Sequence, residues 1–376
     1  MTVELVEDQD TLAGLWAELA ERSTNVFATP EWHSVWWRHL GNGRSVIAVD
    51  RARELILPLE VRRIGPLTVA RTAGHGPADE LGPIGRPGAW RAMPELAAAV
   101  AQVAPLLIVD RVHHDERAET DADAAPASER SDRAADAGAP QSSRPLLPRR
   151  KVSRPLLLRR EAWPVVDLPE GGFEAYLAAR SANFRQQVRR KTRRAVRELG
   201  LRFRLAEPAT FERDFATLLR LHRIRFGERS VAFTGPREAF HREFAKVALE
   251  RGWTRLWIAE TDSGDAVASL YGFRFAGVES NYQIGRDPTY DRWSLGFVLF
   301  ARAIAQAAEE GMREYRMLLG DEGYKYRFAT RDPGVFTYAF AASPVARLLA
   351  RGGRAALHLR GRLRRPSGRS PRASDE

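Results

Sequence analysis

The fold is decided by a stretch that opens with two consecutive β-segments, Ala268-Ser-Leu-Tyr-Gly-Phe-Arg-Phe275 and Glu279-Ser-Asn-Tyr-Gln-Ile-Gly285. The segment Arg286-Asp-Pro-Thr-Tyr-Asp-Arg-Trp293 leads from them to a long apolar helix that starts at Ser294-Leu-Gly296. The stretch closes with Glu314-Tyr-Arg-Met-Leu-Leu-Gly-Asp-Glu-Gly-Tyr-Lys325. The two strands are followed by a helix whose first residues are small and include no acid. This arrangement predicts a pocket for an anionic ligand.

The predicted helix from Ser294 to Glu310 is apolar over most of its circumference, so we expect it to pack against a sheet. Its N-terminus then opens at a strand end, where free backbone N–H groups and the helix dipole favour phosphate. Gly296 would let a ligand approach the backbone, and Arg286 and Arg292 would add positive charge. The alternative is an ordinary packed helix that uses its glycine for close contact.

Length and composition set the outer bounds. The chain has 376 residues, which predicts two domains, and its hydrophobic content of 44% is ample for a core. It has no cysteine, which excludes disulfides, thiolate metal sites and a cysteine nucleophile. The acidic N-terminus lacks the apolar core of a signal peptide, and no run approaches the ~18 apolar residues of a membrane helix. We therefore expect a soluble, cytoplasmic protein.

The net charge of +11 is concentrated in two segments. Arg180–Arg204 carries ten basic residues against Glu198 alone, and Arg347–Glu376 carries nine arginines against two acids. A solvated face or a tail is one interpretation of such runs. The other is attraction to nucleic acid, such as tRNA, or, through the basic tail, peripheral contact with a membrane.

The order of helices and strands predicts an α/β chain with mixed sheets flanked by helices. We place a first domain at residues 1–111, an insertion at 112–160, a second domain at 161–342, and a basic helix with a tail at 343–376. Residues 161–180 are also compatible with completing the first domain.

The insertion is predicted from composition. Asp115–Ser143 has no aromatic residue and no aliphatic side chain larger than alanine, so it cannot offset its ordering entropy by burial. A tandem near-repeat follows, Ser143-Arg-Pro-Leu-Leu-Pro-Arg-Arg150 and Ser153-Arg-Pro-Leu-Leu-Leu-Arg-Arg160. We interpret it as a local duplication within a linker.

Helix and strand ends are marked by local signals. Asp10–Arg22 has the spacing of an amphipathic helix, and Thr29-Pro30 has the form of an N-cap followed by a first-turn proline. Val335–Ala342 is predicted to be the last strand, and Ser343-Pro344 to start a closing basic helix. Trp163–Leu168 is predicted to resume ordered structure after the insertion.

Several blocks occur together in a recognisable order. They are Leu221-His222-Arg-Ile-Arg225, Tyr282-Gln-Ile-Gly285-Arg-Asp-Pro288, Ser294-Leu-Gly296, and Gly320-Asp321-Glu322 with Tyr324-Lys325. With these blocks the chain resembles the GNAT-fold acyltransferases of the CelD/BcsL type, also called BioF2-like acetyltransferases, which are relatives of the FemAB peptidyltransferases. The resemblance spans roughly residues 30–342 without the insertion.

Two positions depart from the family pattern. Leu295 stands where a proline is common at the helix start, which leaves the backbone N–H groups in place. Arg316 stands where an aspartate often precedes the Gly-Asp-Glu block, so this chain has no carboxylate for an acid-base role at that position.

The resemblance implies two tandem GNAT-like domains, with acyl-CoA held by the second and transferred directly to an amine. The acceptor would be a small molecule or an amine of a glycan or peptide, as in envelope or exopolysaccharide biosynthesis. Ser294, Leu295, Gly296 and Arg292 would then bind the cofactor, and Tyr282, Arg286 and His222 would contact the substrate.

Direct transfer requires a base for the amine proton and a donor for the leaving thiolate. Asp321 and Glu322 are the candidate bases, and Tyr324 is the candidate donor, with Tyr282 as a second choice. Lys325 would bind a cofactor phosphate or hold the carboxylates by pairing. A capped turn, packed tyrosines and a buried histidine are the alternatives for these residues.

Other site classes lack their motifs. His113-His114 has no partners at metal-ligand spacing, and neither a P-loop nor a Gly-x-Ser-x-Gly elbow is present, so we expect no metal. Two further functions stay open: a Fem-like transfer from aminoacyl-tRNA, suggested by the basic Arg180–Arg204 segment, and a non-catalytic, degenerate GNAT module, suggested by Arg316.

Overall fold

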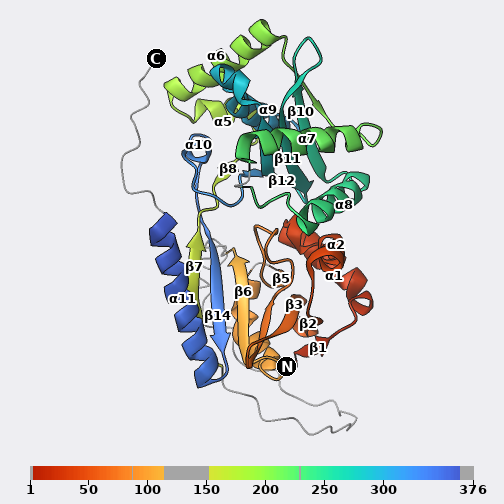
Figure 1. The fold of residues 1–376 in the computed structure, drawn as a ribbon, viewed down its shortest axis with the longest axis vertical. Helices are drawn as coiled ribbons and strands as arrows, with labels where there is room; N and C mark the ends of the chain where they lie inside the picture. The colour runs from red at the N-terminus through yellow and green to blue at the C-terminus, as the bar shows by residue number, and fades with distance from the viewer. Residues whose placement is uncertain (1–2, 87, 114–151, 228–229, 365–376) are drawn as a thin grey trace, which may run out of the picture.

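The computed structural model describes residues 3–86, 88–113, 152–227 and 230–364, and the side chains among them except those of 356–364. Two sheets lie one above the other along the long axis of the molecule (Figure 1). Both are mixed and flanked by helices, which confirms the predicted α/β class. The predicted insertion Asp115–Ser143 lies outside the described residues.

The lower sheet contains eight strands among the described residues, in the order β1-β2-β3-β4-β6-β14-β7, with β5 paired to β3. Their bounds are β1 (Glu4–Val6), β2 (Arg44–Asp50), β3 (Leu55–Ile64), β4 (Leu67–Thr72), β5 (Ile84–Gly85), β6 (Leu106–Val112), β7 (Leu156–Glu161) and β14 (Val335–Ala341). The helices of this half are α1 (Ala13–Ser23), α2 (Pro30–Leu40), α3 (Met93–Val100) and α11 (Pro344–Arg364).

The upper sheet has the order β8-β13-β12-β11-β10-β9 in the described part of the chain. Its strands are β8 (Val165–Asp167), β9 (Arg202–Leu205), β10 (Thr254–Glu260), β11 (Ala266–Phe275), β12 (Val278–Arg286) and β13 (Glu314–Arg316). Its helices are α5 (Gly172–Ala178), α6 (Ala182–Leu199), α7 (Phe211–Phe226), α8 (Pro236–Glu250), α9 (Leu295–Glu309) and α10 (Gly323–Tyr326).

The predicted start of α2 is confirmed. The Thr29 hydroxyl accepts a hydrogen bond from the backbone N–H of Trp32 at 3.2 Å, and Pro30 occupies the first turn. This cap directs Trp32, which is fully buried, into the upper half of the molecule. Its ring lies 4.8 Å from that of Phe240 and 4.7 Å from that of Phe244, centroid to centroid. The two halves therefore share one aromatic core.

The sheets do not follow the domain boundaries predicted from the sequence. Residues 156–161, most of which we assigned to the insertion, form β7, because Leu156 and Leu158 pack in the core under α11 while Leu157 and Arg159 point away. Strand β14 pairs with β7 and β6, so Val335–Ala341 belongs to the lower sheet rather than to the second domain. Strand β8 pairs with β13 and lies in the upper sheet, which argues against residues 161–180 completing the first domain.

Candidate active site

The site is created where two parallel strands separate. Strand β12 pairs with β13 only over Val278–Ser280, and its remaining six residues continue without that neighbour. A bulge at Tyr282 interrupts the pairing of β12 with β11, so Tyr282 and Gln283 both reach the face covered by α7 and α8. Gly272 permits this close pairing, because a Cβ there would lie 1.9 Å from the Ser280 carbonyl oxygen.

Helix α9 starts beside this opening without a cap. Ser294 adopts a left-handed conformation (φ 54°), and its hydroxyl accepts from the Lys191 ammonium at 3.1 Å instead of capping the helix. The first turn contains no acid. The backbone N–H groups of Leu295, Gly296 and Phe297 donate to no acceptor among the described residues, whereas Val298 donates to the Ser294 carbonyl. Three donors and the positive end of the dipole therefore point at one place.

The surroundings of Gly296 are loose enough for a small group. A Cβ added at Gly296 would meet nothing closer than 3.7 Å, where it would touch the side chains of Arg286 and Ile284. Ser294 and Gly296 are half-buried rather than closed off by neighbouring side chains. The backbone at the helix start is therefore partly exposed at these two residues.

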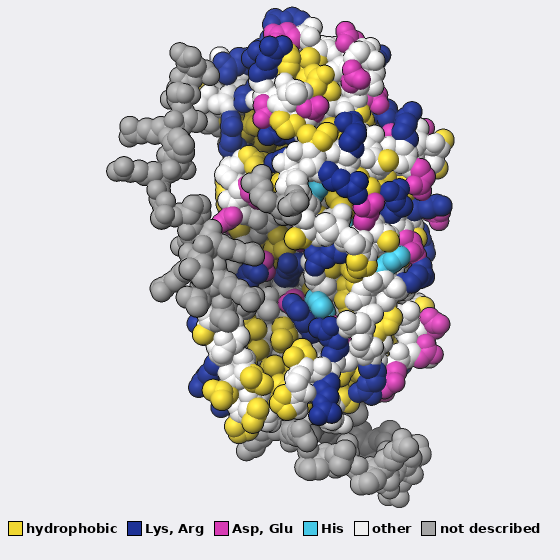
Figure 2. Space-filling view, viewed as in Figure 1, with side chains coloured by type: hydrophobic (Ala, Val, Ile, Leu, Met, Phe, Trp, Pro, Cys, Tyr) yellow, Lys and Arg dark blue, Asp and Glu magenta, His cyan; other side chains and the backbone are white. Residues whose placement is uncertain are grey.

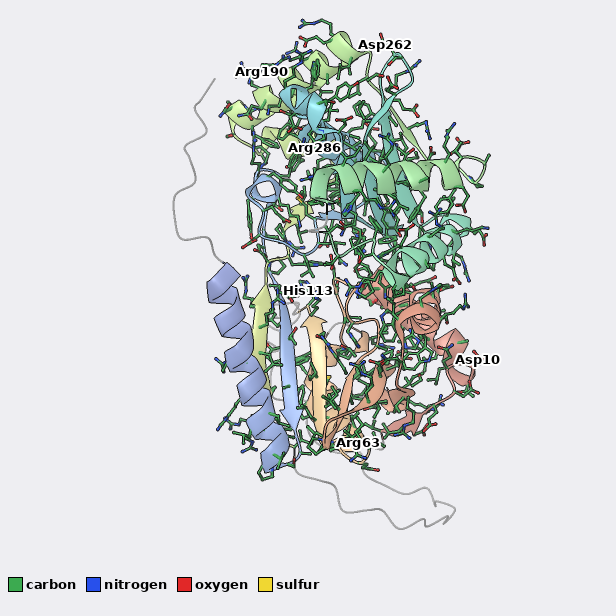
Figure 3. All side chains as sticks on the ribbon, viewed as in Figure 1. Asp10, Arg63, His113, Arg190, Asp262 and Arg286 are labelled. Carbon is green, nitrogen blue, oxygen red and sulfur yellow. The ribbon has the colours of Figure 1, made fainter. Side chains whose placement is uncertain are left out.

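Four basic side chains from four separate elements reach this region. Arg286 ends β12 and pairs with Asp291, whereas Lys191, Arg225 and Arg327 form no ion pair with any residue that the structure describes. Burial lowers the pKa of Lys191, and the charges of Arg327 and Arg190 lower it further. Figure 3 labels Arg286 and Arg190 in the upper half.

Arg225, like Lys191, has a pKa below its ordinary value. Burial lowers the pKa of Arg225, and the charge of Arg286 acts in the same direction. Tyr324 and Glu322 act in the opposite direction, which shows that they lie near this guanidinium. A group of cations that outnumbers the acids around it is the electrostatic pattern of a site for an anion.

Tyr324 stands on α10, with its ring 5.3 Å from that of Phe300 on α9. Burial raises the pKa of Tyr324 well above its ordinary value, and the charge of Glu322 raises it further. The hydroxyl therefore keeps its proton at neutral pH. Glu322 and Asp321 are both exposed, but Glu322 interacts with Tyr324 and Arg225, whereas Asp321 acts on Tyr326.

Lys325 is buried, with its ammonium 3.1 Å from Glu322 Oε2 and hydrogen-bonded to the Leu319 carbonyl. The turn at Gly320 (φ 126°) makes this possible, since a Cβ there would lie 2.8 Å from Lys325 Nζ. The structure therefore shows the pairing role that we considered for Lys325, and a phosphate contact stays a prediction. Asp79 of the lower half joins the same loop, where it accepts from the Leu319 N–H at 3.3 Å.

Tyr282 and His222 lie on the other face of β12. The Tyr282 hydroxyl donates to the Pro77 carbonyl at 2.8 Å, and His222 lies 3.1 Å from Gln283 Oε1 through its Nε2. Burial lowers the pKa of His222 to about 4, so the ring is neutral at pH 7. Burial raises the pKa of Tyr282 well above its ordinary value. The structure does not bring these two side chains to the start of α9.

The remaining predicted residues have other surroundings. Arg292 is exposed, and its guanidinium lies over the Trp293 ring at 3.8 Å. Arg316 joins the two halves: it donates to the Thr24 carbonyl at 2.9 Å and pairs with Glu80 at 3.3 Å. This architectural role explains a cation at that position.

Sequence reasoning missed Lys191, Arg225, Arg327 and Asp79 as members of the site. The first two lie within segments that we had singled out, the basic helix and the Leu-His block, and a helical spacing of three places Arg225 on the face of His222. No local signal marked Asp79. Within the described ranges, no cluster of His, Asp and Glu side chains has the geometry of a metal site.

A family model described as "Acetyltransferase (GNAT) domain" matches residues 182–326, which include the separated strands, α9 and α10. This segment is a GNAT acyltransferase domain. No curated protein matches the chain. The match to the GNAT family model confirms the acyltransferase prediction from the sequence, whereas membership of the CelD/BcsL group stays a prediction.

Solved structures show the same two-sheet fold. FemX is 10% identical, with a TM-score of 0.58, over 92% of this chain and 100% of that one. The C-terminal domain of a putative lysylphosphatidylglycerol synthetase from Agrobacterium fabrum is 10% identical, with a TM-score of 0.54, over 93% and 97%. L-PGS from Bacillus licheniformis is 13% identical, with a TM-score of 0.52, over 95% and 97%. These similarities establish a Fem-related fold.

Proposed function

We propose that the chain transfers an acyl group from acyl-CoA to an amine acceptor at the start of α9. The observation that carries the proposal is the set of three backbone N–H groups at Leu295, Gly296 and Phe297, which have no acceptor among the described residues. Lys191, Arg225 and Arg327 lie around them and form no ion pair within the described ranges. The phosphates of coenzyme A match both features, because they are anionic and accept several hydrogen bonds at once.

The reaction would be a direct attack of the amine nitrogen on the thioester carbonyl. A C–N bond forms, the C–S bond breaks, and the amine loses a proton while the sulfur leaves as a thiolate. Tyr324 would donate its proton to that thiolate, since burial keeps the hydroxyl protonated. Glu322, near Tyr324 and Arg225, is the better placed of the two candidate bases, and we assign it to the amine proton.

The proposed acceptor is a primary amine on a small molecule, glycan or peptide. The resemblance to the CelD/BcsL group supports a place in envelope or exopolysaccharide biosynthesis. Strands β12 and β13 separate beyond Ser280 and Arg316, and we propose that the acceptor amine approaches the thioester along this separation.

Calorimetric titration of the purified full-length chain with acetyl-CoA and longer acyl-CoAs tests the proposal. We expect saturable binding that weakens as salt is raised, because the contacts are ionic. Desulfo-CoA, which keeps the phosphates, and adenosine, which lacks them, serve as matched ligands. If none of the acyl-CoAs binds, the proposal fails.

A Fem-like use of aminoacyl-tRNA is the second candidate. The exposed arginines of α6 favour it, and Figure 2 shows Lys and Arg side chains gathered at the top of the molecule, where Figure 1 places this helix. Arg190 and Arg193 form no ion pair with any described residue. Binding of tRNA at low salt, with no heat on addition of acyl-CoA, would favour this function over the first.

A further inference from the structure

Helix α11 leaves an apolar face in solvent. It packs on the lower sheet through Ala346 and Ala350, which are 0% and 6% exposed. On its other side, Leu348 is 72% exposed, Val345 57% and Leu349 48%. Three large apolar side chains within five residues of one helix are a patch rather than scattered exposure. We call Val345, Leu348 and Leu349 the apolar patch.

Unpaired positive charge borders the apolar patch. Arg347, Arg351 and Arg354 are exposed, and none of them forms an ion pair with a described residue. Helix α11 contains no acid over its whole length, so nothing within it neutralises these arginines. The patch therefore combines exposed leucines with a net positive border.

We propose that α11 binds the surface of an anionic lipid bilayer, with the apolar patch inserted at the acyl boundary and the arginines at the headgroups. A helix with large apolar side chains on one face and arginines beside them has the composition of an interfacial helix. Nucleic acid would use the arginines but would gain nothing from burying Leu348. A protein partner would need acidic residues matched to the spacing of these arginines. An anionic bilayer supplies both an apolar interior for the leucines and negative headgroups for the arginines.

The placement of α11 suits such a surface. The helix runs along one side of the lower half and leaves the upper half, with the candidate active site, at a distance from its start (Figure 1). In Figure 2, hydrophobic side chains gather at the lower left, on the part of the molecule where α11 begins. None of the described helices is long and apolar enough to cross a membrane, so contact through α11 would be peripheral.

Co-sedimentation of the full-length chain with vesicles tests the proposal. We expect strong binding to vesicles of phosphatidylcholine with phosphatidylglycerol and weak binding to phosphatidylcholine alone. The double variant Leu348→Asp with Leu349→Asp should lower the partition coefficient at least about tenfold. Each change removes an apolar side chain that inserts into the bilayer and adds a negative charge that the anionic headgroups repel. Replacing Arg347 and Arg351 by Gln should lower it about fivefold for each arginine.

Val196→Asp is the matched control. Val196 is also exposed (44%) on an arginine-rich helix, but it lies on α6 in the upper half. The control should bind vesicles like the parent chain, and all variants should keep the parent melting temperature and acyl-CoA titration. Equal binding of the Leu348/Leu349 variant to anionic vesicles would overturn the proposal. So would binding to tRNA that depends on Arg347 and Arg351 without any binding to vesicles.

Discussion

Gly296→Ala separates ligand binding from folding at the start of α9. In the free protein a Cβ at this position meets nothing closer than 3.7 Å, and the backbone has ordinary helical angles. Alanine should therefore be tolerated and should stabilise the helix by about 0.5–1 kcal/mol relative to glycine. The melting temperature should stay the same or rise slightly.

Binding should respond in the opposite direction. In the proposed complex the new methyl group would stand between a phosphate and the N–H groups of Leu295, Gly296 and Phe297. Loss of one hydrogen bond to a charged group costs about 1.5–3 kcal/mol, which raises the dissociation constant roughly tenfold to a hundredfold. The assay is titration calorimetry with acetyl-CoA, with melting followed by circular dichroism on the same samples.

Gly14→Ala is the matched control for this experiment. Gly14 lies in the first turn of α1 and has no atom within 4 Å of an added Cβ, so it should show the same small gain in stability with unchanged affinity. If Gly296→Ala binds acetyl-CoA as tightly as the parent chain, the backbone at the start of α9 does not hold the phosphates. The mechanism built on it would then be refuted.

Three further predictions follow from the contacts around the site and the interface. Glu322→Gln should lower turnover at least about tenfold and Asp321→Asn much less, because only Glu322 lies near Tyr324 and Arg225; equal effects in a steady-state assay would reverse this assignment. Arg316→Ala should lower the free energy of unfolding by about 3–5 kcal/mol in a denaturant titration, since it strands the buried Glu80 carboxylate; a change below about 1 kcal/mol would contradict the interface role. The free energy of unfolding should fall as pH drops from 7 to 5. Burial lowers the pKa of His33 and His222 to about 4 and of His241 to about 3, so these histidines take up protons more readily in the unfolded chain. Each histidine then lowers the free energy of unfolding by about 2 kcal/mol at pH 5. Burial raises the pKa of Glu279 to about 7, which offsets about 2 kcal/mol, and a stability that rises toward pH 5 would contradict this balance.

Local signals predicted most elements because their causes are local. The Thr29 cap, the apolar circumference of α9 and the alternation in β11 each depend on residues within one or two turns. The assignment of β14 to the lower sheet depends on its pairing with β6, more than two hundred residues earlier, which no local pattern encodes. The near-repeat misled us for the same reason, because Leu156 and Leu158 become core residues only once α11 covers them.

The site was predictable to the same extent. The open helix start at Ser294 and Gly296 follows from composition and helix geometry. The cations that complete it, Lys191 and Arg225, come from helices whose packing against β12 and α9 decides where their ends lie. Lys325 pairs with Glu322, one of the two roles expected for it, and the turn at Gly320 decides this by folding its ammonium under the loop.

The shared aromatic core has a consequence for how ligands enter and leave. Trp32 belongs to one half by chain connectivity and to the other by its neighbours Phe240 and Phe244. A hinge motion that parted the halves would return some 200 Å² of indole to water, at a cost on the order of 5 kcal/mol. Such an opened form would be populated only about once in several thousand molecules. A ligand bound at the start of α9 should therefore enter and leave without separation of the two halves, and calorimetric melting should give a single transition for both.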